Sequence, residues 1–142
     1  MKQMAEKTIV IKNKDEEISK AVELVREYLR HENFSEDCGC SLAVAFDEML
    51  SNVIHHGYDD LSEHSIKIIL SVKGKDFIGI IEDDGVEFNP LLQPEANTSL
   101  PLSERKMGGL GIHLVRKMMD KVEYKRIKNK NVLTIFKADE RK

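Results

Sequence analysis

The sequence predicts an α+β fold in a single domain spanning residues 1–142: a two-layer α/β sandwich whose mixed, mostly antiparallel sheet carries helices on one face. Three observations predict it. The apolar spacing changes along the chain in the order strand, helix, helix, strand, strand, long loop, helix, strand, strand, and a doubly wound parallel sheet would alternate instead. A length of 142 residues suits one domain of ordinary size. A hydrophobic content of 41%, with only three prolines and eight glycines, supplies a core and argues against disorder.

The first half of the chain predicts one strand and two helices. Residues Lys7 to Lys12 alternate around branched isoleucines and predict a short strand. From about Asp15 to His31, apolar residues recur at helix spacing: Ile18, Ala21, Val22, Val25, Tyr28 and Leu29. A second helix is expected from Ser35 or Glu36 to His56, with Gly57 as its C-cap.

The second half predicts two hairpins separated by a loop and a third helix. A strand is expected over 66–72, where apolar and polar residues alternate strictly, and its partner over 77–82. Residues 85–108 show no periodicity, and a loop longer than about 15 residues in a compact domain is usually functional. The remaining elements are expected as a helix from about Leu110 to Asp120, a strand from Val122 to Ile127 and a strand from Val132 to Ala138.

Charge and composition exclude several classes of function. The 22 Lys and Arg residues against 25 Asp and Glu, a net charge of −3, give no electrostatic reason to bind nucleic acid or an anionic membrane. No apolar run is long enough to span a membrane and the N-terminus has no signal-peptide core, so we expect a soluble, cytoplasmic protein. Cys38 and Cys40 alone are too few for a zinc site, and the adjacent His55 and His56 point about 100° apart on a helix.

A polar pair on the second helix is the first candidate site. Glu48 and Asn52 are one helical turn apart, so their side chains lie about 6 Å from each other and can share a ligand or a metal ion. A solvated polar face is the alternative interpretation, and helix statistics alone favour it.

Two further segments contain residues suited to ligand binding. Asp83 ends a strand, where an ionised carboxylate can accept hydrogen bonds from a ligand amine, and Gly85 permits close backbone approach. A plain turn is the alternative there. Gly109 and Gly111 open the third helix, whose free N–H groups and partial positive charge suit phosphate oxygens. A flexible hinge is the alternative, and neither the Walker nor the Rossmann spacing is present.

Three motifs contain these candidate residues: AFDEMLSNVIHHGY, IEDDGVEFNP and MGGLGIHLVRKMMD. Together they resemble the N, G1 and G2 boxes of the Bergerat-fold ATPases, the group of gyrase, heat-shock chaperone ATPases and histidine kinases. Their order and spacing extend over nearly the whole chain and are more specific than any single box. The short length, the D-x-G-x-x-F-x-P form and the LVRKMMD ending resemble the bacterial anti-sigma-factor serine kinases, which phosphorylate a small antagonist protein and sequester a sigma factor.

The resemblance implies roles at the phosphate end of a bound ATP. Asn52 would give its amide oxygen to Mg²⁺, beside phosphate oxygens and waters. Glu48 would be the catalytic residue that orients or deprotonates the attacking hydroxyl. Gly109 and Gly111 would bind phosphates.

It also implies roles at the adenine end. Asp83 would accept the adenine amino group, Gly85 would give access to the base, and Thr134 would help to hold adenine through a water.

Residues 86–107 would form the ATP lid, in which Arg105 and Lys106 would contact the γ-phosphate. The sequence departs from the pattern at Glu87, where the G1 box usually has a second glycine, and at Val53, where the N box usually has alanine.

The function expected from this resemblance is that of a cytoplasmic, Mg-ATP-dependent serine-protein kinase that regulates a sigma factor. Its partners would be a small antagonist protein and a sigma factor, and the related kinases imply a homodimer. One alternative is a module that binds ATP without catalysis in order to grip a partner. Another is the ATPase end of a histidine kinase, which we favour less because the chain is too short to include dimerising helices.

Overall fold

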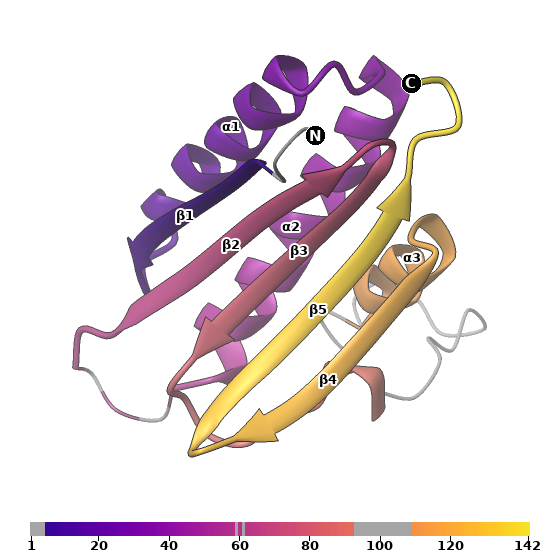
Figure 1. The fold of residues 1–142 in the computed structure, drawn as a ribbon. Helices are drawn as coiled ribbons and strands as arrows, with labels where there is room; N and C mark the ends of the chain where they lie inside the picture. The colour runs from indigo at the N-terminus through magenta and orange to yellow at the C-terminus, as the bar shows by residue number, and fades with distance from the viewer. Residues whose placement is uncertain (1–4, 59, 61, 93–108) are drawn as a thin grey trace.

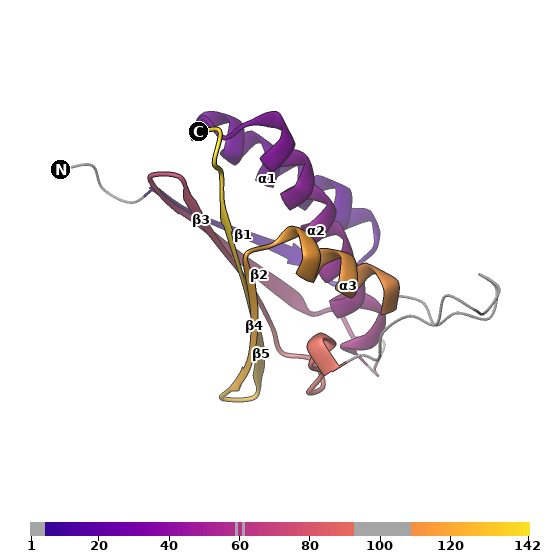
Figure 2. The ribbon, with the colours of Figure 1, turned by 90° about the vertical axis from the view of Figure 1, so that its right-hand side faces the viewer.

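The protein folds as a five-stranded sheet with three helices on one face, in a computed structural model that describes residues 5–58, 60, 62–92 and 109–142 (Figures 1 and 2). The elements are β1 (Ala5–Lys12), α1 (Glu16–His31), α2 (Glu36–His56), β2 (Ser65–Lys73), β3 (Asp76–Asp83), a 3-10 turn η1 (Pro90–Leu92), α3 (Gly109–Met118), β4 (Lys121–Ile127) and β5 (Lys130–Ala138). This arrangement confirms the α+β, two-layer fold.

The strands lie in the order β1-β2-β3-β5-β4, and all four pairings are antiparallel. The sheet formed by the described residues is therefore antiparallel throughout, rather than mixed. Both predicted hairpins, β2–β3 and β4–β5, are present, and the connection that contains α3 carries the chain from β3 to β4 (Figure 1).

Helix α2 begins at a well-made cap and ends at the predicted glycine. The Ser35 hydroxyl accepts a hydrogen bond from the N–H of Cys38 at 3.2 Å. The backbone N–H and the hydroxyl of Ser35 donate to the Asp139 carboxylate at 2.6 and 2.9 Å. At the other end, the N–H of Gly57 donates to the Val53 carbonyl at 2.8 Å. The chain terminus after β5 thereby fixes the start of the helix that carries the candidate polar pair.

The core lies between the helices and the inner face of the sheet. Every second residue of β3 is buried, and β2 follows the same alternation except at Ser71, which is buried between Leu70 and Val72. The Phe46 ring meets the Phe77 ring edge-on at 6.2 Å, and a side chain at Gly79 would approach the Phe46 ring to 2.7 Å. A glycine in the centre of β3 thus makes room for α2 to lie close to the sheet.

Among the described residues, no helix covers the other face of the sheet (Figure 2). The residues of β2, β3 and β5 that point toward this uncovered face include six half-buried side chains: Ile69, Ile78, Ile80, Val132, Thr134 and Phe136. None of the described helices has the length and apolar character needed to cross a membrane.

Candidate nucleotide-binding site

The polar pair on α2 lies on a covered side of the helix. Asn52 is 8% exposed and Glu48 is half-buried, and α3 contacts α2. The interpretation of a solvated helix face is therefore wrong. Within the described part of the chain, the Asn52 amide forms no hydrogen bond with another residue, so its oxygen and N–H groups are available to bind a ligand.

Glu48 reaches the first turn of α3. A Cβ placed on Gly111 would lie 3.0 Å from Glu48 Cγ and would overlap its carboxylate, so these two predicted site residues are in contact. The pKa of Glu48 is raised, chiefly because burial disfavours the charged form and secondarily because Asp47 is nearby. A carboxylate with a raised pKa is a stronger base than an exposed one.

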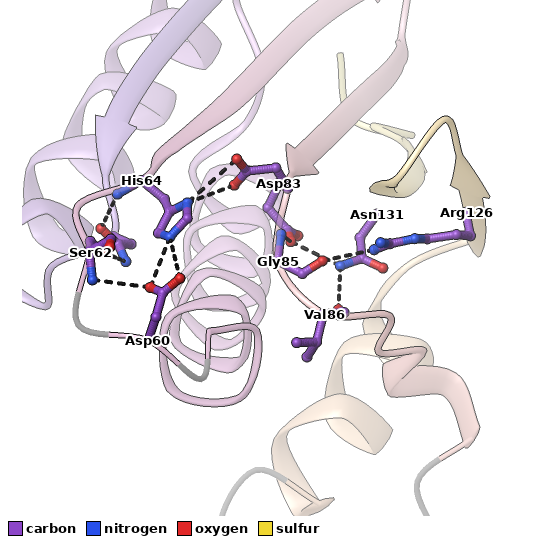
Figure 3. Close-up of polar contacts among 10 residues, drawn as sticks. Asp60, Ser62, His64, Asp83, Gly85, Val86, Arg126 and Asn131 are labelled. Carbon is purple, nitrogen blue, oxygen red and sulfur yellow. Dashed lines mark hydrogen bonds and ion pairs between the residues drawn. The ribbon is translucent and has the colours of Figure 1, made fainter.

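Asp83 is a buried carboxylate at the end of β3, with 4% of its surface exposed. Its Oδ1 accepts the backbone N–H of Gly85 at 2.9 Å and the Nδ2–H of Asn131 at 2.9 Å (Figure 3). Burial raises the pKa of Asp83 despite these bonds, which act in the opposite direction. Neither donor bonds to Oδ2, the second oxygen of the carboxylate.

The turn after Asp83 is held by one backbone and one side-chain hydrogen bond. The N–H of Val86 donates to the Gly57 carbonyl at 2.6 Å, and Arg126 Nη1 donates to the Gly85 carbonyl at 2.9 Å. A Cβ on Gly85 would lie 2.8 Å from the Gly57 carbonyl carbon and 3.0 Å from Asp83 Oδ1. Gly85 is therefore required for close backbone approach to the end of α2.

Asn131 is a site residue that the sequence did not reveal. It lies at the start of β5, is 5% exposed and pairs with Asp83 across the sheet. Thr134, the residue expected beside adenine, pairs instead with Ile80. Because residues at odd distances along a strand face opposite sides, Thr134 lies on the open face of the sheet, away from Asp83. The structure does not bring Thr134 to the site.

A group of contacts around His64 lies on the side of Asp83 away from Asn131 (Figure 3). His64 contacts Asp60 through Nε2 at 3.0 Å and Asp84 through Nδ1 at 3.2 Å, and its ring stacks on Tyr58 at 4.5 Å. The Asp60 bond is the main reason that the pKa of His64 is raised. Over the described residues, no three His, Cys, Asp or Glu side chains group closely enough to hold a metal ion, and both cysteines are free.

Part of the predicted site lies outside the described residues. Arg105 and Lys106 belong to it, as does the lid from residue 93 onward. At the described base of the lid, Glu87 is exposed and Phe88 stacks on His56 at 5.5 Å. The first turn of α3 contains Gly109 and Gly111, as predicted.

These groups fit an adenine nucleotide with Mg²⁺. A buried acceptor suits the adenine amino group, and the amide oxygen of Asn52 is the type of ligand that Mg²⁺ takes beside phosphates and waters. The start of a ten-residue helix suits phosphate oxygens. Asn52 and Glu48 come from one helix, Gly111 from a second and Asp83 from the end of a central strand.

Comparison with known proteins gives a consistent picture. Residues 11–137 match the family model described as histidine kinase-like ATPase domain. The chain is 35% identical to an anti-sigma F factor of Clostridium kluyveri over 96 residues, and this match covers 66% of this chain and 65% of that protein. It is 33% identical over 93 residues to the serine-protein kinase RsbW of Halalkalibacterium halodurans, and this match covers 59% of this chain and 53% of that protein. The matches thus span less than two thirds of these relatives.

Solved structures agree with the fold. The RsbU and RsbW domains of a Mycobacterium tuberculosis protein superimpose with a TM-score of 0.68 at 13% identity, covering 94% of this chain and 32% of that one. The catalytic domain of histidine kinase ThkA has a TM-score of 0.50 at 16% identity, covering 97% and 98%. At such identities the likeness concerns the fold alone.

Proposed function

The chain belongs to the histidine kinase-like ATPase domain family, and on this premise we propose that it is a serine-protein kinase that uses Mg-ATP and regulates a sigma factor. The names of its relatives, anti-sigma F factor and serine-protein kinase RsbW, support both parts of this proposal. Its substrate would be a serine of a small antagonist protein, and both partners would meet it in the cytoplasm.

At the adenine end, Asp83 is the residue that recognises the base. Its carboxylate is buried, is fixed through Oδ1 and belongs to a turn that two neighbouring segments hold. An ionised carboxylate accepts the adenine amino group and disfavours a base that offers a carbonyl there. Gly85 contributes by keeping the turn close to α2.

At the phosphate end, Asn52 holds Mg²⁺ through its amide oxygen, and the backbone N–H groups of Gly109 and Gly111 bind phosphate oxygens. When bound, Mg-ATP supplies the γ-phosphoryl group and the charge of the metal ion. Arg105 and Lys106 would contact the γ-phosphate from the lid formed by residues 86–107.

Glu48 acts on the incoming serine. Its carboxylate orients the hydroxyl and accepts its proton, a role that a partly buried base with a raised pKa suits. The observation that carries the kinase proposal is the contact of this carboxylate with Gly111, which brings the base to the helix start where phosphates bind. A module that only binds ATP has no use for a base at this position.

We further propose a homodimer. The half-buried apolar side chains on the uncovered face of the sheet, such as Ile80 and Phe136, offer apolar surface for a second copy. Sedimentation of the wild type is expected to give a dimer, and Ile80→Lys, which places a charge on this face, is expected to give a monomer. A monomeric wild type would contradict the dimer.

The kinase proposal is tested by capturing partners from the native cell with Mg-ATP or Mg-ADP and searching them for phosphoserine by mass spectrometry. Wild-type protein is expected to phosphorylate a captured partner. Glu48→Gln is expected to capture it with the phosphorylation rate reduced about 10²–10⁴-fold. The matched control is Glu27→Gln, the same substitution at an exposed position of α1. A wild type that captures partners without phosphorylating any of them would support a binding module without catalysis.

A further inference from the structure

Asn131 makes four polar contacts, although the proposed chemistry gives it no direct part. Its Nδ2 donates to Asp83 Oδ1 at 2.9 Å and to the Val86 carbonyl at 2.8 Å (Figure 3). Its Oδ1 accepts the hydroxyl of Tyr124 and, at 3.4 Å, the N–H of Phe88. The buried amide thus connects the end of β3, the first residues after it and strand β4.

These contacts allow only one orientation of the amide. Asp83 Oδ1 and the Val86 carbonyl can only accept and the Phe88 N–H can only donate, so a flipped amide would lose these three bonds, whereas the Tyr124 hydroxyl can pair with either end. The Val86 carbonyl and the Phe88 N–H therefore fix which end of Asn131 faces Asp83. A side chain held in this way has little freedom to follow the carboxylate if the latter rotates.

We propose that Asn131 is a positioning residue for nucleotide recognition: it holds the Asp83 carboxylate as an acceptor toward adenine and joins it to Val86 and Phe88 at the base of the lid. This inference rests on the proposed role of Asp83 in binding adenine. Asn131 does not touch the base in this account and acts only through its neighbours.

The charge of Asp83 depends on Asn131. Burial raises the pKa of Asp83, and the Asn131 bond is the strongest of the influences that lower it again, ahead of the Gly85 N–H. The negative charge of Asp84 also raises the pKa of Asp83, and the positive charge of Arg126 lowers it. Tyr58 and Tyr124 also lie near Asp83, but their pKa values are raised by burial, so both stay neutral at pH 5–8.5.

The pH dependence of nucleotide affinity is the readout that separates positioning from a purely structural role. A hydrogen bond donated to a carboxylate favours its charged form and so lowers its pKa. Asn131→Leu, of similar size, removes that bond, so Asp83 should take up a proton at higher pH. A protonated Asp83 offers a poorer acceptor, so the variant should lose affinity as the pH falls.

The experiment is calorimetric titration of Mg-ATP into each protein at several pH values between 5 and 8.5. The Kd of Asn131→Leu divided by that of the wild type is expected to be about tenfold larger at pH 5 than at pH 8.5. Titration of ATP itself and of His64, which contacts Asp84, affects both proteins alike and cancels in this ratio. Tyr124→Phe, which removes one of the two donors to Asn131 Oδ1, should shift the ratio less and in the same direction.

Asn129→Gly is the matched control, because Asn129 is exposed in the turn just before β5 and has φ 64°, which glycine adopts without strain. Its Kd should stay within about twofold of the wild type at every pH. A ratio for Asn131→Leu that does not change with pH would overturn the inference, as would an unchanged Kd. If Asn131→Leu does not fold, an unshifted Tyr124→Phe overturns it. A wild type that binds no Mg-ATP would instead contradict the proposed function.

Discussion

The carboxylate of Glu48 in α2 lies against the backbone of Gly111 in the first turn of α3, and a Cβ on Gly111 would overlap it. Two motifs separated by more than sixty positions therefore meet through one side chain and one residue that lacks a side chain. An anionic group near a helix N-terminus is stabilised by the helix dipole, and the same place suits a phosphate.

Gly111→Ala is expected to displace Glu48 and reduce phosphoryl transfer at least about tenfold, because a misplaced base loses its contact with the hydroxyl. The measurement is the transfer rate at saturating Mg-ATP. Gly39→Ala is the control: this glycine lies in α2 with nothing within 4 Å of a built Cβ. It should leave the rate unchanged and raise the free energy of unfolding by about 0.5–1 kcal/mol through helix propensity. Equal rates for Gly111→Ala and wild type would show that the contact is not needed.

Asn52→Ala is expected to weaken nucleotide binding only when Mg²⁺ is present. The amide oxygen is the proposed metal ligand, so its loss should not matter when the metal is chelated. Titration of ADP with Mg²⁺ and with excess EDTA checks this, using Ser51→Ala as the control because Ser51 bonds only to His55 in the described structure. The same loss of affinity in both conditions would exclude a metal-binding role for Asn52.

Asp139 predicts a pH-dependent contribution to stability. Burial alone would raise its pKa, but the N–H and hydroxyl of Ser35, together with the Arg141 N–H and the Lys142 charge, lower it below the ordinary 3.8. A lowered pKa in the folded state means that the stabilisation is complete above about pH 4–5 and is lost as the pH falls through the folded-state pKa.

Asp139→Asn should therefore lower the free energy of unfolding in urea at pH 7 and have a much smaller effect at pH 2. Asp76→Asn, at an exposed position of β3, serves as the control and should change little at either pH. The same loss for Asp139→Asn at both pH values would contradict the assignment.

The local pattern of the sequence predicts the elements and much of the site. The second helix was expected to end at Gly57 and does so, and α3 begins at the glycines expected to open it. The burial of Glu48 and Asn52 was not predictable from the periodicity of α2, because α3, which Glu48 contacts, follows an aperiodic segment. A face that looks polar along one helix can be covered by another.

The errors at the adenine end have a similar cause. Which residue of β5 faces Asp83 depends on the register between β3 and β5, and a shift by one residue places a side chain on the other face. Motif matching placed Thr134 beside the base, whereas the observed register places Asn131 next to Asp83. Asn131 follows a turn of lysines and asparagines, where its identity carries no signal of burial.

The most direct test of the account is calorimetric titration of Mg-ATP into wild type, Asp83→Asn and Asp84→Asn. Asp83→Asn keeps the shape of the side chain but can turn an NH₂ donor toward the adenine amino group, and an unpaired buried polar group costs about 1–3 kcal/mol. Asp84→Asn makes the same change at the adjacent, more exposed carboxylate. We predict that the wild type and Asp84→Asn bind with similar Kd values, whereas Asp83→Asn binds at least about tenfold more weakly. Equal affinity of Asp83→Asn and the wild type would contradict the adenine role of Asp83, and the absence of binding to the wild type would contradict the account as a whole.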